Sequence, residues 1–289
     1  MIRVIFWGTR GSSTTPGPET LKYGGNTPCV ELIALPHQEP GYLQGSEVLN
    51  LLLDGGTGII EQIPEQTSRD SNGGIHILLT HHHWDHVMGL PFYAPLHTPD
   101  NRVSFYGKSS VEVQASIERL FASVYSPLKG VDNVRGELSY HAVNGKPSAV
   151  NGFVVHTTET SHGAPALSYR IEHGEEAVVY TPDHEAGIDS VVDSRLIESA
   201  RKAELWILNG HFNQKEKKTR VGWGHSSHLE AVELALRAEV KTLAIFHHNP
   251  DHDDEMLDQM NDEVQTRINE ADIEVVMSKD RMVMDVVSG

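Results

Sequence analysis

The chain has 289 residues, 38% of them hydrophobic and 22% charged, a globular composition that suits one large domain or two small ones. No apolar run approaches the ~18 residues of a membrane span, the first residues do not resemble a signal peptide, and the single cysteine, Cys29, excludes an intramolecular disulfide. We therefore expect a cytoplasmic protein without a membrane segment. The formal charge of -17 disfavours a long nucleic acid as partner, because phosphate contacts dominate nucleic-acid affinity.

Strand-sized apolar runs and amphipathic helical segments alternate along the chain. The predicted strands are Ile2–Trp7, Cys29–Ala34, Val48–Leu53, Ile75–Leu79, Val103–Tyr106, Val154–Thr158, Leu167–Ile171, Ala177–Tyr180, Leu205–Leu208 and Leu243–Phe246. The predicted helices are Val111–Phe121, Leu229–Ala238, which opens with a capping-box spacing, and Glu255–Glu270. Pro36–Gly45 and Ser126–Gly136 are expected to be surface loops. Because no linker-like stretch interrupts this mixture, we expect a single α/β domain over residues 1–289.

The 18 histidines gather where predicted strands end. The strand "IHILL" continues into "THHHWDH", "FVVHTTET" into "SHG", "AVVY" into "TPDHE" and "LAIF" into "HHNP". Ligand sites in α/β proteins lie beyond the carboxyl ends of the strands. Four such ends carrying His or Asp therefore predict one common site.

The segment "HHHWDH" has the spacing of a metal-binding loop. If His81 and His83 extend the strand, their side chains point the same way and His82 points elsewhere, while Asp85 and His86 follow on the first helical turn. Imidazoles combined with a carboxylate are ligands of Zn, Mn or Fe. A purely structural role is disfavoured, because clustered imidazoles repel one another once protonated.

At these residues the sequence resembles the metallo-β-lactamase-fold hydrolases, whose H-x-H-x-D-H motif has this form. The segments "LLLDGGTGI", "SHGAPALSYRI", "VVYTPD" and "LAIFHH" resemble further motifs of the same family, so the likeness covers nearly the whole chain. The segments "FWGTRGSSTTPGPETLKYGGNTPCVEL" and "GWGHSS" resemble the branch that contains ribonuclease Z and small cyclic phosphodiesterases. The resemblance implies a four-layer αββα sandwich, of α/β or α+β class, with its site at one edge of the two sheets.

The resemblance also implies two divalent metal ions, with zinc expected and manganese or iron as alternatives. The implied ligands are His81, His83 and His162 for one ion and Asp85, His86 and His247 for the other, with Asp183 bridging the two. Asp54 would brace the metal loop from behind. We expect His82 not to bind, and we prefer His247 to the adjacent His248.

We assign catalytic roles to His225, Asp85 and Asp183. Two ions of this kind share a hydroxide at neutral pH and polarise a phosphoryl group. The ribonuclease-like branch pairs its "GHS" histidine with a carboxylate, but here Asn209 stands at that position; an amide can orient a ring but cannot transfer a proton. His225 could act alone, which we favour, His211 could replace the acid, or the leaving group could need little help. The alternative role for His225 is to brace the helix that begins near Ser227.

These observations favour a dinuclear metal-dependent phosphodiesterase that acts on a small-molecule substrate such as a cyclic nucleotide or a cyclic sugar phosphate. One alternative is a tRNA 3′-end endonuclease of ribonuclease Z type, against which the charge of -17 and the lack of a long basic arm count. The others are a thioester or lactam hydrolase and a non-catalytic metal-binding regulatory protein. A diiron oxidoreductase is disfavoured, because its motif lacks the equivalent of His83. The sequence leaves open whether the protein forms a homodimer.

The remaining chemistry-bearing residues are assigned simpler roles. Trp84, Met88 and Phe92 are expected to pack the metal loop against the sheet rather than to wall a pocket. His76 is expected to be packed inside its strand, and His184 and His228 to face solvent. The histidines interpreted as surface or structural residues are His37, His97, His141, His156, His173 and His252.

Overall fold

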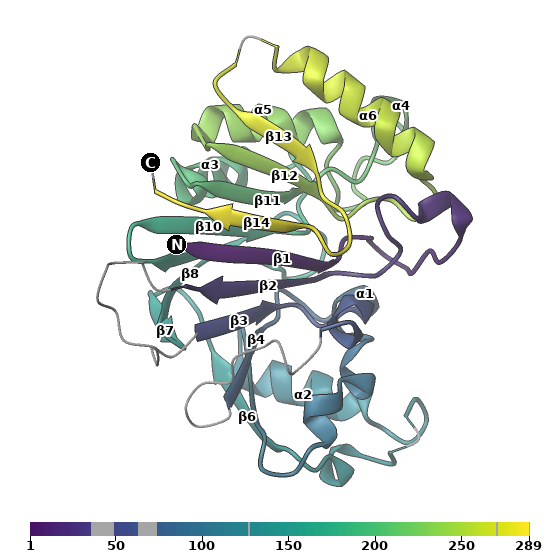
Figure 1. Ribbon diagram of the computed structural model, residues 1–289, viewed down its shortest axis with the longest axis vertical. Coiled ribbons are helices and arrows are strands. Elements are labelled where there is room, and N and C mark those ends of the chain that lie inside the picture. The colour runs from purple at the N-terminus through teal and green to yellow at the C-terminus, as the bar shows by residue number, and fades with distance from the viewer. Residues whose placement is uncertain (36–48, 63–73, 127, 270, 289) are drawn as a thin grey trace.

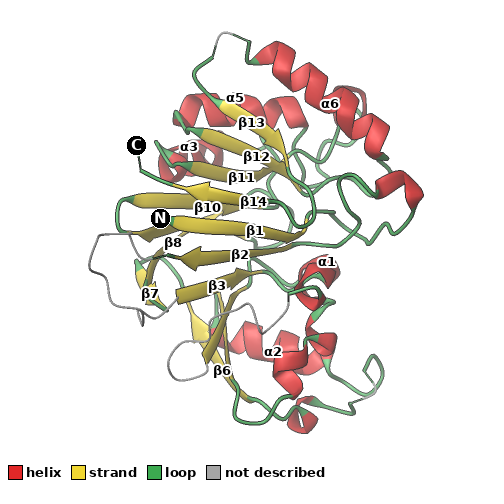
Figure 2. Ribbon diagram, in the orientation of Figure 1, coloured by secondary structure: helices red, strands yellow, loops and turns green. Residues whose placement is uncertain are grey.

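Two mixed β-sheets packed face to face form the frame of the computed structural model, which describes residues 1–35, 49–62, 74–126, 128–269 and 271–288. The first sheet contains β1 (Ile2–Gly8), β2 (Cys29–Ala34), β3 (Leu49–Leu53), β4 (Gly74–Leu78), β5 (Arg102–Gly107), β6 (Glu137–Ala142) and β14 (Val283–Val286). The second contains β7 (Ser148–Val150), β8 (Phe153–Glu159), β9 (Leu167–His173), β10 (Glu176–Thr181), β11 (Leu205–Asn209), β12 (Thr242–Phe246) and β13 (Glu274–Met277). Helices lie outside both sheets, which gives the four layers of an αββα sandwich (Figure 2).

The helices connect and cover the strands. The α-helices are α1 (Trp84–Val87), α2 (Ser110–Leu120), α3 (Ser190–Ala200), α4 (Gln214–Lys217), α5 (His228–Ala238) and α6 (Asp254–Arg267). Short 3₁₀ turns occupy Pro18–Thr20, Thr57–Ile60, Leu90–Phe92, Ala94–His97 and Val131–Asn133. Among the described residues, none of the helices combines the length and the apolarity that a membrane crossing requires.

Parallel pairing brings the site-bearing strand ends to one edge. The first sheet has the order β14-β1-β2-β3-β4-β5-β6, in which β3 to β6 run parallel. The second has the order β13-β12-β11-β10-β9-β8-β7, in which β10 to β13 run parallel. In Figure 1, β3 and β12 point to the side where α1 lies, and the two chain ends lie at the other side. The carboxyl ends of the parallel strands in both sheets are therefore available to build a shared site.

Three apolar layers separate the four layers of backbone. Ile2, Val4 and Phe6 alternate along β1 and pack between the sheets against side chains such as Tyr180 and Phe246. A second cluster joins the outer face of β10 to β13 to α3, α5 and α6, and a third joins the outer face of β3 to β5 to α2. Strand β10 is buried along its whole length because both of its faces are covered.

The fold class expected from the sequence is confirmed, and the expected strands and helices appear close to their predicted limits. Val48 and Pro36–Gly45 lie outside the described residues. Sequence reasoning missed helix α3, although Asp189 caps it by accepting from the amides of Val191 and Val192. It also missed β6, β7, β13 and β14, which are short or lie at or near sheet edges, where one-sided burial weakens the apolar pattern.

Phe153 tests the packing between the sheets, because it is fully buried at the start of β8. We predict that Phe153→Ala lowers the free energy of unfolding of the metal-free protein by about 3–5 kcal/mol in urea denaturation. The neighbouring Val154 is 41% exposed, so Val154→Ala is the matched control and should change the stability by less than about 0.5 kcal/mol. Equal losses for the two variants would contradict this account of the core.

Candidate metal centre

The histidine-rich loop and three other strand ends meet at one edge of the sandwich. His83 Nδ1 lies 3.1 Å from His162 Nε2, and His81 completes a group whose donor atoms all lie within 4.8 Å of one another. Beside it, His86 Nε2 lies 3.3 Å from both Asp85 Oδ2 and His247 Nε2. The structure thus brings together the two sets of residues that the sequence resemblance implied for two ions.

Asp183, which follows β10, lies between the two groups. Its Oδ2 is 2.8 Å from His86 Nε2 and 3.8 Å from His81 Nε2. Its Oδ1 is 3.5 Å from His247 Nε2 and 3.8 Å from His162 Nε2. One carboxylate therefore faces ligand atoms of both groups, as a bridging residue must.

The donor set fits divalent metal ions better than it fits a hydrogen-bond network. Atoms about 2.05 Å from a tetrahedral zinc are about 3.3 Å from one another, close to the separations observed within each group. His81 Nε2 and both oxygens of Asp183 are buried and have no hydrogen bond of acceptable geometry among the described residues. Buried polar atoms are rarely left in that state, so these atoms are directed at a common point rather than at one another.

Hydrogen bonds from behind fix the orientation of the candidate ligands. His86 Nδ1 donates to Asp54 Oδ2 (2.8 Å), and Tyr180 and Thr80 also donate to that carboxylate. His162 Nδ1 donates to the carbonyl oxygen of Gly224 (2.8 Å). In each histidine this leaves Nε2 free to bind a metal, which is the usual outcome of such bracing.

Two of the residues at this centre have an unusual backbone conformation. Asp54 and His247 have φ values of 59° and 60°, in the left-handed region that non-glycine residues rarely adopt. Gly11 lies against the His247 ring so closely that a Cβ atom there would be 2.2 Å from Nδ1. Strain of this kind persists only where the surrounding structure enforces it, and it marks functional sites.

The electrostatics of the cluster keep Asp183 and His81 in the deprotonated form that binds metal, but they favour the protonated form of His86. Burial disfavours charge on Asp183, but His247, His162 and His86 outweigh it and hold the pKa of this carboxyl well below its usual range. Burial, reinforced by the neighbouring His86, lowers the pKa of His81 well below that of a free imidazole. For His86, burial opposes the charge but the carboxylates of Asp85, Asp54 and Asp183 outweigh it and raise the pKa. An incoming ion therefore has to displace a proton from this ring.

His225 lies beside the metal cluster, with its Nδ1 3.2 Å from Asp183 Oδ1. Its ring stacks on His211 at a centroid separation of 4.3 Å, and burial lowers its pKa to about 3. Asn209 is fully buried, yet neither of its side-chain polar atoms has a hydrogen-bond partner among the described residues, so this amide does not orient His225. Nor does His225 cap helix α5, because Ser227 does so in a capping box.

A buried ion pair that the sequence analysis missed holds the loop that carries His225. Lys217 Nζ donates to Glu185 Oε1 (2.7 Å) and to the carbonyl oxygen of His225 (2.9 Å). Glu185 also accepts from the amides of Gly222 (2.7 Å) and Gly224 (2.6 Å). Because Gly224 in turn orients His162, Glu185 positions a candidate ligand and His225 together. No motif in the sequence singles out either member of this pair.

The other histidines are placed as follows. His82 belongs to none of the described donor groups, and His248 donates from Nε2 to the carbonyl oxygen of Ser278. The expectation that His184 and His228 face solvent is wrong, because both are fully buried and bonded to Asp193 and Glu263. His76 contacts the Tyr106 hydroxyl as a packed strand residue, His252 is a buried structural residue bonded to Glu216, and His37 lies outside the described residues.

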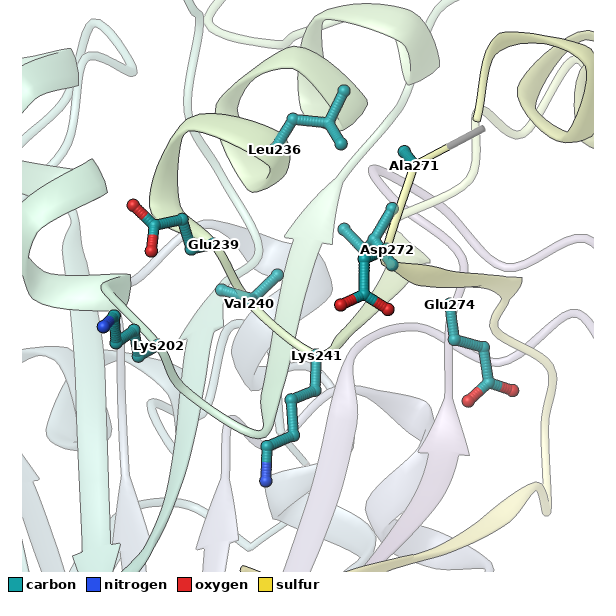
Figure 3. Close-up of a pocket in the computed structure, with 9 residues that line it drawn as sticks. Lys202, Leu236, Glu239, Val240, Lys241, Ala271, Asp272 and Glu274 are labelled. Atoms are coloured by element: carbon teal, nitrogen blue, oxygen red, sulfur yellow. The ribbon is translucent and has the colours of Figure 1, made fainter. Parts of the chain in front are cut away.

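A surface hollow at the opposite end of the strands is not part of this centre. It has a volume of about 960 Å³ and is lined by residues such as Lys202, Lys241 and Asp272, which Figure 3 shows around the end of α5. These three residues precede β11, β12 and β13, respectively, whereas His247 follows the opposite end of β12. The hollow contains no histidine, and its mixed charges are those of an ordinary surface.

An αββα sandwich with a buried His/Asp cluster at the shared edge of its sheets defines the class of metallo-β-lactamase-fold proteins. A family model described as the beta-lactamase superfamily domain matches residues 49–248, and the chain belongs to this superfamily. The chain is 28% identical over 244 residues to ribonuclease Z of Methanopyrus kandleri, a match that covers 72% of this chain and 80% of the relative. Family and relatives together indicate a metal-dependent hydrolase.

Solved structures share the fold. The metallo-beta-lactamase fold protein YhfI from Bacillus subtilis superposes with a TM-score of 0.70 at 19% identity, over 99% of this chain and 100% of that one. A diphosphatase from the PhnP family gives a TM-score of 0.62 at 17% identity, over 99% of this chain and 98% of that one. These similarities confirm the family and branch that the sequence motifs indicated.

The role of the buried ion pair is testable through metal affinity. We predict that Glu185→Gln weakens metal binding about 10–100-fold, since residues that orient ligands have effects of this size, when affinity is measured by competition with a chromogenic chelator. Glu198 forms an exposed ion pair with Arg201, so Glu198→Gln is the matched control and should bind metal like the wild type. Unchanged affinity in Glu185→Gln would show that the pair is irrelevant to the centre.

Proposed function

We propose that this protein is a dinuclear metal-dependent phosphodiesterase acting on a small or cyclic phosphodiester. The observation that carries the proposal is the position of Asp183 between two groups of donors, with His225 next to it. We expect zinc at both positions, because three imidazoles in one group and two imidazoles with a carboxylate in the other are its usual ligands. Manganese and iron stay alternatives.

The expected chemistry divides between the ions and the chain. The two donor groups that share Asp183 would hold two divalent ions, which would supply a hydroxide at neutral pH and neutralise charge on the phosphoryl oxygens. Asp54 holds the His86 ring in the orientation that keeps Nε2 directed at the centre. His225, whose depressed pKa leaves it neutral at pH 7, donates its N–H to the phosphate or to the departing oxygen. In this scheme His225 acts without Asn209.

The names of the relatives support hydrolysis at phosphorus. One curated relative is a ribonuclease and one structural neighbour is a diphosphatase, and both names denote cleavage of bonds to phosphorus. A thioester or lactam hydrolase and a non-catalytic metal protein receive no such support. We further expect the protein to work in the cytoplasm, and a homodimer is compatible with the proposal.

The ribonuclease Z relative also makes tRNA 3′-end cleavage a second candidate. The charge of -17 opposes a polyanionic substrate, and the hairpins and loops in the described part of the chain include no long basic arm. Incubation of the metal-loaded protein with a precursor tRNA carrying a 3′ trailer decides between the two. Cleavage at the discriminator position would favour the nuclease over the small-molecule enzyme.

The direct test is hydrolysis of bis(p-nitrophenyl) phosphate by protein loaded separately with zinc, manganese or iron. We predict turnover that a chelator abolishes and that Asp183→Ala lacks, because this variant loses the carboxylate facing both donor groups. The metal content of each preparation is measured alongside the rate. If two ions per chain are bound and this activated diester is still not hydrolysed, the phosphodiesterase assignment is wrong.

The roles of His225 and His211 can be distinguished by how the loss of kcat in each variant depends on the leaving group. We predict that His225→Ala lowers kcat by about 10²–10³ on a diester with an alkoxide leaving group and by less on a p-nitrophenyl ester, because the N–H of a neutral imidazole stabilises the departing oxygen by a hydrogen bond and an alkoxide carries more charge than a nitrophenolate. His211→Ala, which removes the stacking partner, should have the smaller effect on both. A larger loss in His211→Ala would make His211 the hydrogen-bond donor instead.

A further inference from the structure

A second hollow adjoins the metal centre on the side of the first sheet. It has a volume of about 640 Å³ and lies between helix α2 and the histidine-rich loop. Leu79, Val87 and Leu120 contribute apolar surface to it, and Trp84 and Tyr125 are also among its lining residues. We call it the α2 groove. Its size is within the range of small-molecule sites.

The α2 groove borders the candidate metal centre. Its lining includes His81 and the exposed His83, two of the residues placed around one ion. The side of His83 is therefore where a substituent of a phosphate held at the centre would enter the groove. A groove elsewhere on the surface would carry no such implication.

Two exposed aromatic side chains stand together at the groove. Trp84 is 57% exposed and Tyr125 is 67% exposed, with ring centroids 5.8 Å apart and ring planes at 73° to each other. The expectation that Trp84 packs against the sheet is wrong. Trp84 lies between His83 and Asp85 in the chain, so metal binding on both sides of it fixes its backbone. Such rings offer faces on which a planar ligand group can stack.

The groove also offers polar groups beside its apolar surface. Lys108, Glu112 and Arg119 line it. Lys108 is paired with Glu159 at 2.6 Å, so the groove offers both donors and acceptors of hydrogen bonds rather than a net positive charge. A ligand group that is planar and aromatic and also carries hydrogen-bonding atoms matches this combination, and a bare sugar does not.

We propose that the α2 groove binds a nucleobase, so that the substrate class is a nucleoside phosphodiester, such as a cyclic nucleotide, rather than a cyclic sugar phosphate without a base. Because the two rings are at 73° to each other, the base stacks on the face of one and contacts the edge of the other, while its phosphate lies at the metal centre. This inference rests on the proposed function for the position of the phosphate. Stacking of one base on an aromatic side chain is strong enough to change affinity by about tenfold or more.

The test compares two probes that differ only in the base. Binding of adenosine 5′-monophosphate and of ribose 5-phosphate to the zinc-loaded protein is measured by calorimetry. We expect the nucleotide to bind at least about tenfold more tightly. Equal affinities for the two probes would overturn the proposal.

Substitutions in the α2 groove test whether the preference for the nucleotide arises there. Tyr125→Ala and Trp84→Ala should each remove most of the preference for the nucleotide while leaving ribose 5-phosphate binding unchanged, and Trp84→Phe should restore it. Phe92 is 63% exposed in the same segment but does not line the groove, so Phe92→Ala is the matched control and should retain the full preference. A preference that survives Tyr125→Ala and Trp84→Ala would overturn the assignment to this groove.

Measured rates of hydrolysis show whether a negative result contradicts this inference or the proposed function. Hydrolysis of adenosine 2′,3′-cyclic phosphate should exceed that of methyl riboside 2,3-cyclic phosphate in kcat/KM, mainly through KM. If bis(p-nitrophenyl) phosphate is hydrolysed but the base makes no difference to binding or turnover, the groove inference fails alone. If the calorimetric preference is present and no diester is hydrolysed, the base site stands and the phosphodiesterase assignment fails.

Discussion

The constraint on which this structure depends is the burial of too many metal-binding side chains to satisfy one another. The imidazoles of His81, His86 and His247 surround the Asp183 carboxylate at the shared edge of two sheets, where water is largely excluded. Several of their polar atoms approach within 4 Å but lack the geometry of hydrogen bonds. Buried polar groups of this kind are costly unless cations complete the arrangement. Asp54 and His247 at this centre also have left-handed backbone conformations, which their surroundings hold in place.

Support for the centre comes from both halves of the sandwich. From the first sheet, Asp54 fixes His86 and also accepts from Tyr180 of the second sheet, so the carboxylate links the two sheets. From the second, the Glu185–Lys217 ion pair holds the loop that orients His162 and carries His225. A buried pair of this type is a weak source of stability by itself, but it is an effective means of fixing one loop conformation. The pair fixes the backbone of His225, whereas Asn209 does not bond to its ring.

The residues expected to govern reactivity and those expected to govern substrate selectivity lie in different surroundings. The candidate ligands and their braces are mostly buried and belong to strand ends, whereas Trp84 and Tyr125 are exposed and border the α2 groove. A strongly acidic surface, with the charges of Lys108, Glu112 and Arg119 together at that groove, suits a small ligand better than a long polyanion. The same metal chemistry can therefore serve different substrates in proteins of this fold, because the groove residues are free to vary around it.

The sequence by itself determined the α/β class, most of the strands and the metal-binding character of the loop with His81, His83, Asp85 and His86, because apolar runs and ligand spacing are local signals. The four-layer sandwich and the full ligand set followed from its resemblance to a known family. It did not reveal α3, the edge strands β6 and β14, or the burial of His184 and His228, since these depend on what packs against them. Tertiary structure alone decided that Glu185, Lys217 and Gly224 act on one loop, and that Trp84 faces a groove beside α2. These residues are far apart in the chain, and no periodicity or motif records a contact that exists only after the sheets have closed on each other.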